Sequence, residues 1–207
     1  MSTLSVGSLE GLAANSNVIS VPTGHKLNVA DAGALQIGGS GVVSAGLVHI
    51  SRTTIGTAVS SVTVSDAFSS DYDNYRIIVA GSVGSINLTI ALRFGSTASG
   101  YKFAVQQNTF AGSASSSGTT SASQLNLGGV ADSAGSEGHC VIDVSGPNLA
   151  CGTGVTSSTI YGHPTVGRLD TFGGVEPSST QHTAFDILAT SGTMTGGTID
   201  VYGYAKA

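Results

Sequence analysis

The stretch INLTIALRFG, at residues 86–95, decides the fold class that we expect for this chain. Large apolar residues alternate there with smaller or polar ones. The apolar set is Leu88, Ile90, Leu92 and Phe94, and the set between them is Asn87, Thr89, Ala91 and Arg93. Side chains two residues apart lie on the same face of a strand. The pattern therefore predicts a β-strand with one buried face.

Similar stretches recur along the chain after residue 46. Strands are predicted at residues 47–55, 60–64, 74–81, 86–95, 101–107, 123–129, 139–145, 157–163, 166–174, 182–190 and 197–205. Turns rich in Gly, Ser, Asn and Asp separate them, and no segment shows a sustained helical period. We therefore expect an all-β fold, an antiparallel β-sandwich of jelly-roll type.

The composition agrees with this fold class. Hydrophobic residues make up 40% of the 207 residues and charged residues only 9%, and the chain has 30 glycines. This hydrophobic content supports a buried core, and the low charge argues against a solvated, disordered chain. A net charge of -5 without any cluster of lysines or arginines offers nothing to a phosphate backbone, so we expect no nucleic-acid partner.

The sequence also predicts where the protein is made. No run approaches the 18 apolar residues of a membrane helix, and the start MSTLSVGSLEG lacks the basic flank and apolar stretch of a signal peptide. We therefore expect no membrane insertion, and synthesis in a cytosol from which the protein leaves only as part of a larger particle.

A different pattern precedes the predicted strands. Apolar pairs recur every eight residues, with one polar residue inside each pair and turn residues between the pairs. The pairs are Ile19 and Val21, Leu27 and Val29, and Leu35 and Ile37, with Val43 and Ala45 as a weaker fourth. Each unit is a strand of about three residues plus a turn, too short to bury its own apolar pair. Such repeats become stable when neighbouring units or identical chains share one core; the alternative is a disordered leader rich in Gly and Ser.

The stretch GSGVVSAG, at residues 39–46, predicts a joint between two parts of the chain. We therefore expect residues 1–45 to form an N-terminal stalk or anchor of short-strand repeats. Residues 46–207 are expected to form the sandwich head domain.

Residues suited to metal binding are scattered. The histidines are His25, His49, His139, His163 and His182, and no spacing among them brings two ligands to one metal. In a symmetric trimer one axial histidine can supply three ligands, and His25 and His49 are the candidates for this alternative. Asp71, Asp73 and Asn74 lack the central Gly and distant Glu of an EF-hand, so they predict a turn bonded to nearby backbone.

Residues suited to catalysis form no recognisable set either. His163, Arg168 and Asp170 are near one another in sequence, but no nucleophile motif such as GxSxG accompanies them. No spacing selects a pair of glycosidase acids from Glu137, Glu176 and the aspartates. We expect no catalytic residues, no metal and no cofactor. Tyr72, Tyr75 and Tyr101 are expected to pack rather than to stack on sugars.

Two cysteines, Cys140 and Cys151, flank a predicted turn. A hairpin that turns at residues 146–148 would place them nearly opposite each other, so a cross-strand disulfide stays open. Cytosolic synthesis favours the other reading, in which both are buried free thiols.

The stretch FAGSASSSGTTSAS, at residues 110–123, predicts one long, exposed loop. Sandwich folds commonly carry binding function on such loops, so this loop is the candidate receptor-facing surface. Its candidate residues are Phe110, Ser115, Ser116, Ser117, Thr119 and Thr120. Their hydroxyl groups offer hydrogen bonds, and Phe110 is the one strong anchor among them.

Three stretches resemble structural proteins of tailed bacteriophages, in particular short fibre-like proteins of marine and cyanobacterial phages. They are the leader ISVPTGHKLNV, the central DYDNYRIIV followed by LTIALRFG, and the closing TSGTMTGGTIDVYGYAKA. The resemblance implies a homotrimer whose N-terminal repeats wrap around one axis, with the six apolar residues from Ile19 to Ile37 as the trimer core. It implies no fixed catalytic residues.

The resemblance leaves two positions on the virion open. The protein is either a short fibre or spike that attaches by its N-terminus and presents the sandwich to host surface glycans, or a capsid decoration or head-fibre protein that stabilises the shell. In both cases it is assembled in the host cytoplasm and its partners are itself and other virion proteins.

Overall fold

The computed structural model describes residues 36–37, 40–41, 46–130, 137–162 and 167–206. The chain divides into two units, residues 1–43 and 44–207. In the first unit, β1 (Gln36–Ile37) pairs with β2 (Ser40–Gly41). Within the described ranges no helix has the length and apolar character needed to cross a membrane.

The second unit is built from antiparallel strands. Their bounds are β3 (Leu47–Thr54), β4 (Ser61–Val64), β5 (Asn74–Gly84), β6 (Leu88–Phe94), β7 (Tyr101–Thr109), β8 (Ala114–Ala122), β9 (Leu125–Val130), β10 (Gly138–Ser145), β11 (Thr153–Tyr161), β12 (Arg168–Glu176), β13 (Phe185–Ala189), β14 (Met194–Thr195) and β15 (Thr198–Tyr204). Every pairing between these strands is antiparallel. The expected all-β, antiparallel fold class is confirmed.

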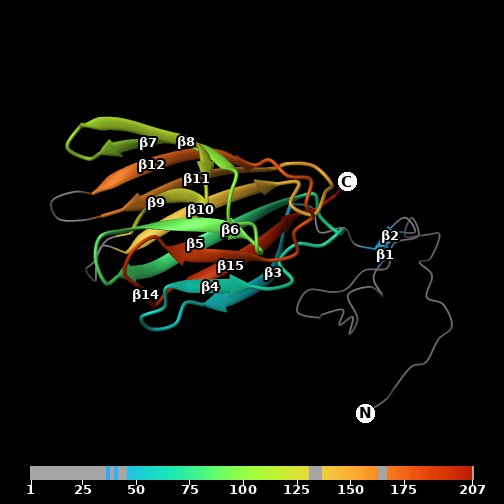
Figure 1. The fold of residues 1–207 in the computed structure, drawn as a ribbon. Helices are drawn as coiled ribbons and strands as arrows, with labels where there is room; N and C mark the ends of the chain where they lie inside the picture. Colours follow the sequence, from blue (N-terminus) through green and yellow to red (C-terminus); the bar gives the residue numbers. More distant parts are fainter. Residues whose placement is uncertain (1–35, 38–39, 42–45, 131–136, 163–166, 207) are drawn as a thin grey trace, which may run out of the picture. The chain divides into compact units, whose positions relative to one another are not determined.

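The strands form two sheets (Figure 1). The large sheet follows the order β3-β15-β5-β10-β11-β12-β7-β8, and β14 also pairs with β5. The small sheet follows the order β4-β13-β6-β9. Strand β9 lies close to β7, β10, β11 and β12, so the small sheet packs on the central part of the large one. Glycine makes this approach close, because a Cβ atom added at Gly128 would lie 2.5 Å from Cβ of Thr159.

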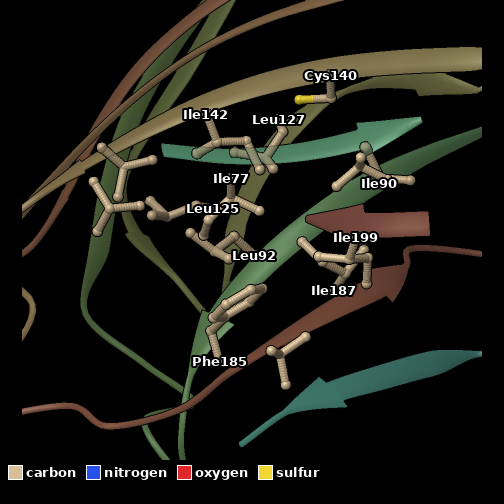
Figure 2. Packing of buried hydrophobic residues seen from close by; sticks show 14 of the residues in the cluster. Ile77, Ile90, Leu92, Leu125, Leu127, Cys140, Ile142, Phe185, Ile187 and Ile199 are labelled. Atoms are coloured by element: carbon tan, nitrogen blue, oxygen red, sulfur yellow. The ribbon is translucent and has the colours of Figure 1, made fainter. Parts of the chain in front are cut away.

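The core lies between the two sheets. The four apolar residues of β6 from Leu88 to Phe94 are all buried, as their alternation predicts. Figure 2 shows Ile90 and Leu92 of β6 beside residues of other strands, among them Ile77 and Ile142 from the large sheet and Ile187 from the small sheet. Full burial of such a side chain stabilises the fold by about 1.5–3 kcal/mol.

Tyr75 and Tyr101 are fully buried in this core, which confirms the prediction that they pack inside the fold. The hydroxyl of Tyr75 accepts a hydrogen bond from the Ser69 N–H at 2.7 Å and donates to the Ser69 carbonyl at 2.8 Å. The hydroxyl of Tyr101 accepts from the Phe94 N–H at 2.9 Å and donates to the Thr97 carbonyl at 3.1 Å. Burial raises the pKa of Tyr101 to about 12. Both hydroxyls therefore fix loops onto the sheets.

The expectation of one long loop at residues 110–123 is wrong. Most of this stretch is strand β8, which pairs with β7 through a turn in which the Thr109 N–H donates to the Ser113 carbonyl at 2.8 Å. Gly112 has a φ of +89°, which only glycine adopts readily. Because β8 has no large apolar residue, no two-residue hydrophobic period marked it as a strand.

Candidate functional site

The candidate receptor-facing residues lie together on the β7–β8 hairpin. Phe110 is in the turn and is 65% exposed. The other five are on β8, where Thr119 is half-buried and Ser115, Ser116, Ser117 and Thr120 are exposed. Because β8 is the last strand of the large sheet, these side chains stand at its edge.

A cleft of about 180 Å³ opens between this hairpin and the small sheet. Its lining comes from β6, β7, β8 and β9 and consists of Thr89, Phe103, Val105, Gln107, Ser117, Gly118, Asn126 and Gly128. Of the candidate receptor-facing residues, Ser117 is the one that lines it. The cleft therefore joins the predicted surface to side chains from both sheets.

Packing in the core fixes the position of Phe103, an aromatic side chain that lines the cleft. The rings of Phe103 and Phe172 lie 5.5 Å apart between centroids. Gly174 leaves room for both, because a Cβ atom added there would lie 2.6 Å from Cζ of Phe172 and 2.9 Å from Cβ of Phe103. The aromatic surface in the cleft is therefore fixed by packing in the core.

The polar lining of the cleft consists of two amides, from Gln107 and Asn126, and two hydroxyls, from Thr89 and Ser117. The Gln124 side-chain NH₂ donates to Oδ1 of Asn126 at 3.2 Å, and the Ser115 hydroxyl donates to Oε1 of Gln107 at 3.4 Å. Each of these bonds uses the oxygen of the lining amide, whose NH₂ group is a donor. No charged residue is among the described residues that line the cleft. The arrangement suits a neutral ligand with hydroxyl groups and an apolar face.

A second hollow, of about 190 Å³, is lined in part by the buried His182. Its ring stacks on Phe94 with the centroids 4.9 Å apart, and its Nε2 lies 3.2 Å from Oε2 of Glu176. Burial raises the pKa of Glu176, but hydrogen bonds from Ser178 and His182 outweigh it and leave the pKa below its usual value. Since this carboxylate already accepts several hydrogen bonds, the pair is built to hold a loop.

The other catalytic candidates form no reacting set in the described residues. Arg168 and Asp170 do come together, with Nε 2.9 Å from Oδ1, and the Gly129 N–H donates to Oδ2 at 2.9 Å. Their sequence neighbour His163 lies outside the described residues. Glu137 is half-buried just before β10.

No group of three His, Cys, Asp or Glu side chains that could hold a metal ion occurs in the described part of the chain. Nε2 of His49 lies 3.4 Å from Oδ1 of Asp200, to which Nε of Arg52 donates at 2.6 Å. Asp200 is buried, and its carboxylate contacts these two side chains of β3. His25 lies outside the described residues.

The trimer-core residues and the turn at residues 71–74 complete the predicted set. Ile37 is in β1, and the other five trimer-core residues, Ile19, Val21, Leu27, Val29 and Leu35, lie outside the described residues. In the turn, the Ser69 hydroxyl donates to Asp71 at 3.1 Å and accepts from its N–H at 3.2 Å. Nζ of Lys206 lies 2.8 Å from Oδ1 of Asp73.

Both cysteines are free thiols, but the expectation that both are buried is wrong. Cys140 is buried and faces Thr159 across β10 and β11, and the Thr159 hydroxyl donates to its sulfur at 3.0 Å. Burial raises the pKa of Cys140 to about 11. Cys151 is exposed in the connection between β10 and β11, whereas the residue opposite Cys140 in the register is Thr159, further along the chain. The longer connection removes the geometry that a cross-strand disulfide needs.

Comparison of the chain with protein-family models, with curated proteins and with solved structures finds no match.

Sequence reasoning missed the three polar residues that line the cleft beside Ser117, namely Thr89, Gln107 and Asn126. The amide-rich runs QQN, at residues 106–108, and SQLN, at residues 123–126, were the signal available. Only the sheet order brings the two runs to one cleft, because it places β9 beside the β7–β8 hairpin.

Proposed function

We propose that this protein is a non-enzymatic structural protein of a tailed-phage virion. In this proposal it is a homotrimeric short fibre or spike, anchored by its N-terminal repeats, whose head domain attaches to a host surface. The three stretches that resemble short phage fibre proteins support the proposal. Other virion proteins and host surface glycans are its partners, and no cofactor takes part.

The head domain in this proposal is a jelly roll, which the order of the strands supports. Without the hairpin β7–β8, the strands β11 and β12, and the short β14, two four-stranded sheets are left, β3-β15-β5-β10 and β4-β13-β6-β9. The chain passes repeatedly from one sheet to the other, in the order of two Greek keys. Jelly rolls of this order are found in viral capsid and lectin domains.

The observation that carries the attachment function is the neutral cleft beside β8. Phe103 and Val105 give the cleft its apolar lining, and Gln107, Asn126 and Ser117 add amide and hydroxyl groups. Sugar rings present the matching surface, since they have apolar C–H faces and a rim of hydroxyl groups. One such cleft makes few contacts, so we expect useful attachment to come from several copies acting together, which can raise avidity about 10² to 10⁴-fold.

The test is binding of the purified full-length protein to host cells. The double variant Gln107→Ala/Asn126→Ala removes both lining amides and should lose most of the cell binding. The matched control, Thr156→Ala/Ser158→Ala, removes exposed hydroxyl groups from the outer face of β11 and should bind normally. Equal binding by both double variants would contradict attachment through the cleft.

Capsid decoration is the second candidate function, and the outer face of the large sheet favours it. Val141 and Ile160 are 38% and 49% exposed there, and Val141 lines a shallow hollow of about 320 Å³. An exposed apolar surface on a rigid sheet suits contact with a shell. Imaging of labelled protein on intact particles separates the two functions: label on the tail supports the fibre, and label across the shell supports decoration.

A further inference from the structure

Strand β8 presents an open edge. Among the described strands it pairs with β7 and with no other, so its far side offers a row of backbone N–H and C=O groups. Proteins usually protect such edges with charged side chains, proline, β-bulges or a covering loop. The segment Ala114–Ala122 contains no charged residue and no proline. Its pairing with β7 is regular from Ala114 to Thr119, and a bulge in β8 follows, because Thr119 pairs with Phe103 and Ala122 with Tyr101. The strand is therefore open to pairing with a further strand.

The sequence of β8 is nearly the same in both directions. In ASSSGTTSA, positions at equal distances from Gly118 carry the same or a similar residue. The matched positions are Ala114 with Ala122, Ser115 with Ser121, Ser116 with Thr120, and Ser117 with Thr119. If two copies of β8 pair antiparallel about Gly118, the matched positions nearest the centre face each other across the contact, and the bulge between Thr119 and Ala122 interrupts the outer ones. Near the centre hydroxyl then faces hydroxyl, which is a favourable cross-strand combination.

We propose that β8 pairs antiparallel with β8 of a second copy of this chain, with Gly118 at the centre. The contact is isologous, because each position faces its matched position in the other copy and the two exchange under a two-fold rotation. Neutral edges bring no like charges together, and both faces of β8 are largely exposed, so described parts of the same head do not cover it. The pairing does not depend on the proposed phage function or on trimer formation.

The geometry of this contact keeps the candidate cleft accessible. A two-fold axis between antiparallel strands runs perpendicular to the sheet, so the small sheets of both copies lie on the same side. The two clefts then open on that side and are separated by the two β8 strands, which lie about 4.8 Å apart. Pairing therefore gives one continuous sheet with two neighbouring clefts.

A contact made by one pair of strands is small beside the roughly 1,200–2,000 Å² of stable interfaces. We therefore expect weak, reversible association that increases with concentration. Sedimentation velocity of the full-length protein across a concentration series measures it. Exchange of the backbone amides of residues 114–122 should slow as the concentration rises.

The decisive variants use the matched pair Ser116 and Thr120, which are both exposed. Ser116→Lys/Thr120→Lys places lysine opposite lysine twice and should weaken association at least about tenfold. Ser116→Lys/Thr120→Glu places each lysine opposite a glutamate and should restore it. Ser145→Lys/Ser158→Lys adds the same charge to exposed positions of inner strands and should associate like the wild type.

Three results would overturn the proposal. They are a wild-type sedimentation coefficient that stays constant up to millimolar concentration, equal association of the wild type and the double-lysine variant, and failure of the lysine/glutamate variant to recover association. The last of these would exclude the register centred on Gly118.

Discussion

The imidazole Nε2 of His182 lies 3.2 Å from Oε2 of Glu176, and both side chains are almost fully buried. The same carboxylate accepts hydrogen bonds from the N–H of Ser178 at 3.0 Å and from its hydroxyl at 2.8 Å. The His182 N–H donates to the Pro147 carbonyl at 2.7 Å. The pair therefore joins the segment after β12 to the connection between β10 and β11.

Removing this carboxylate should destabilise the head domain. Glu176→Ala leaves the buried His182 ring and the partly buried N–H of Ser178 without their acceptor, so we expect the free energy of unfolding to fall by about 1–3 kcal/mol. Urea denaturation followed by circular dichroism measures the change. Ser158→Ala, at an exposed position, should change the free energy by less than about 0.5 kcal/mol. A change equally small in Glu176→Ala would show that the pair does not hold the segment.

Stability should fall in acid because of Asp200. The hydrogen bond from Arg52 lowers the pKa of Asp200 below its usual value of 3.8. The unfolded chain therefore binds this proton more readily than the folded one, so the stabilising contribution is complete well above pH 3.8 and is lost as the pH falls below it. Unfolding measured from pH 7 to pH 2 should show a difference between wild type and Asp200→Asn that shrinks in acid.

The partner of Asp200 provides the control for this pH dependence. Arg52→Gln removes the hydrogen bond that lowers the pKa of Asp200. The free energy of unfolding of this variant should therefore fall less between pH 7 and pH 2 than that of the wild type. Asp143 should contribute a loss of the same sign, because the hydrogen bond from Arg76 lowers its pKa. A difference between wild type and Asp200→Asn that stays constant with pH would contradict the role given to Arg52.

The two thiols should react at very different rates. Cys151 is exposed, whereas Cys140 is buried and burial raises its pKa to about 11, so little reactive thiolate forms there near neutral pH. A thiol reagent added to the native protein should modify one cysteine per chain, and the second should react only on unfolding. Cys151→Ser should abolish the native reaction. Rapid modification of both residues, or of neither, would contradict this assignment.

The neighbouring glycines Gly173 and Gly174 in β12 should respond differently to substitution by alanine. Gly174→Ala places a methyl group against Phe103, Phe172 and Leu125, and overpacking of this kind costs about 1–3 kcal/mol. An added Cβ at Gly173 meets nothing within 4 Å, so Gly173→Ala should be neutral or slightly stabilising. Thermal unfolding of the two variants gives the comparison. Equal midpoints of thermal unfolding would show that Phe103 and Phe172 are loosely packed around Gly174.

Alternation of apolar residues predicted the strands of the head domain well. It placed Leu88 and Ile90 on a buried face because one-sided burial leaves a direct period in the sequence. Strand β8 left no such period, since backbone pairing rather than apolar burial holds it to β7. The cleft and the burial of Asp200 depend on which strands become neighbours. That order is set by contacts between distant parts of the chain, which no local pattern records.

The N-terminal repeats should control assembly without affecting the head. The buried core of residues 44–207 extends from Ile55 to Val201 within that unit, so the head should fold without residues 1–45. Leu27→Asp should abolish the proposed trimer, because three-fold symmetry would bring three buried carboxylates together. Thr156→Asp adds the same charge to an exposed position of the head and should leave the trimer intact. Sedimentation equilibrium of both variants decides the matter: a Leu27→Asp protein with the mass of the wild-type assembly would show that Leu27 faces away from a shared core.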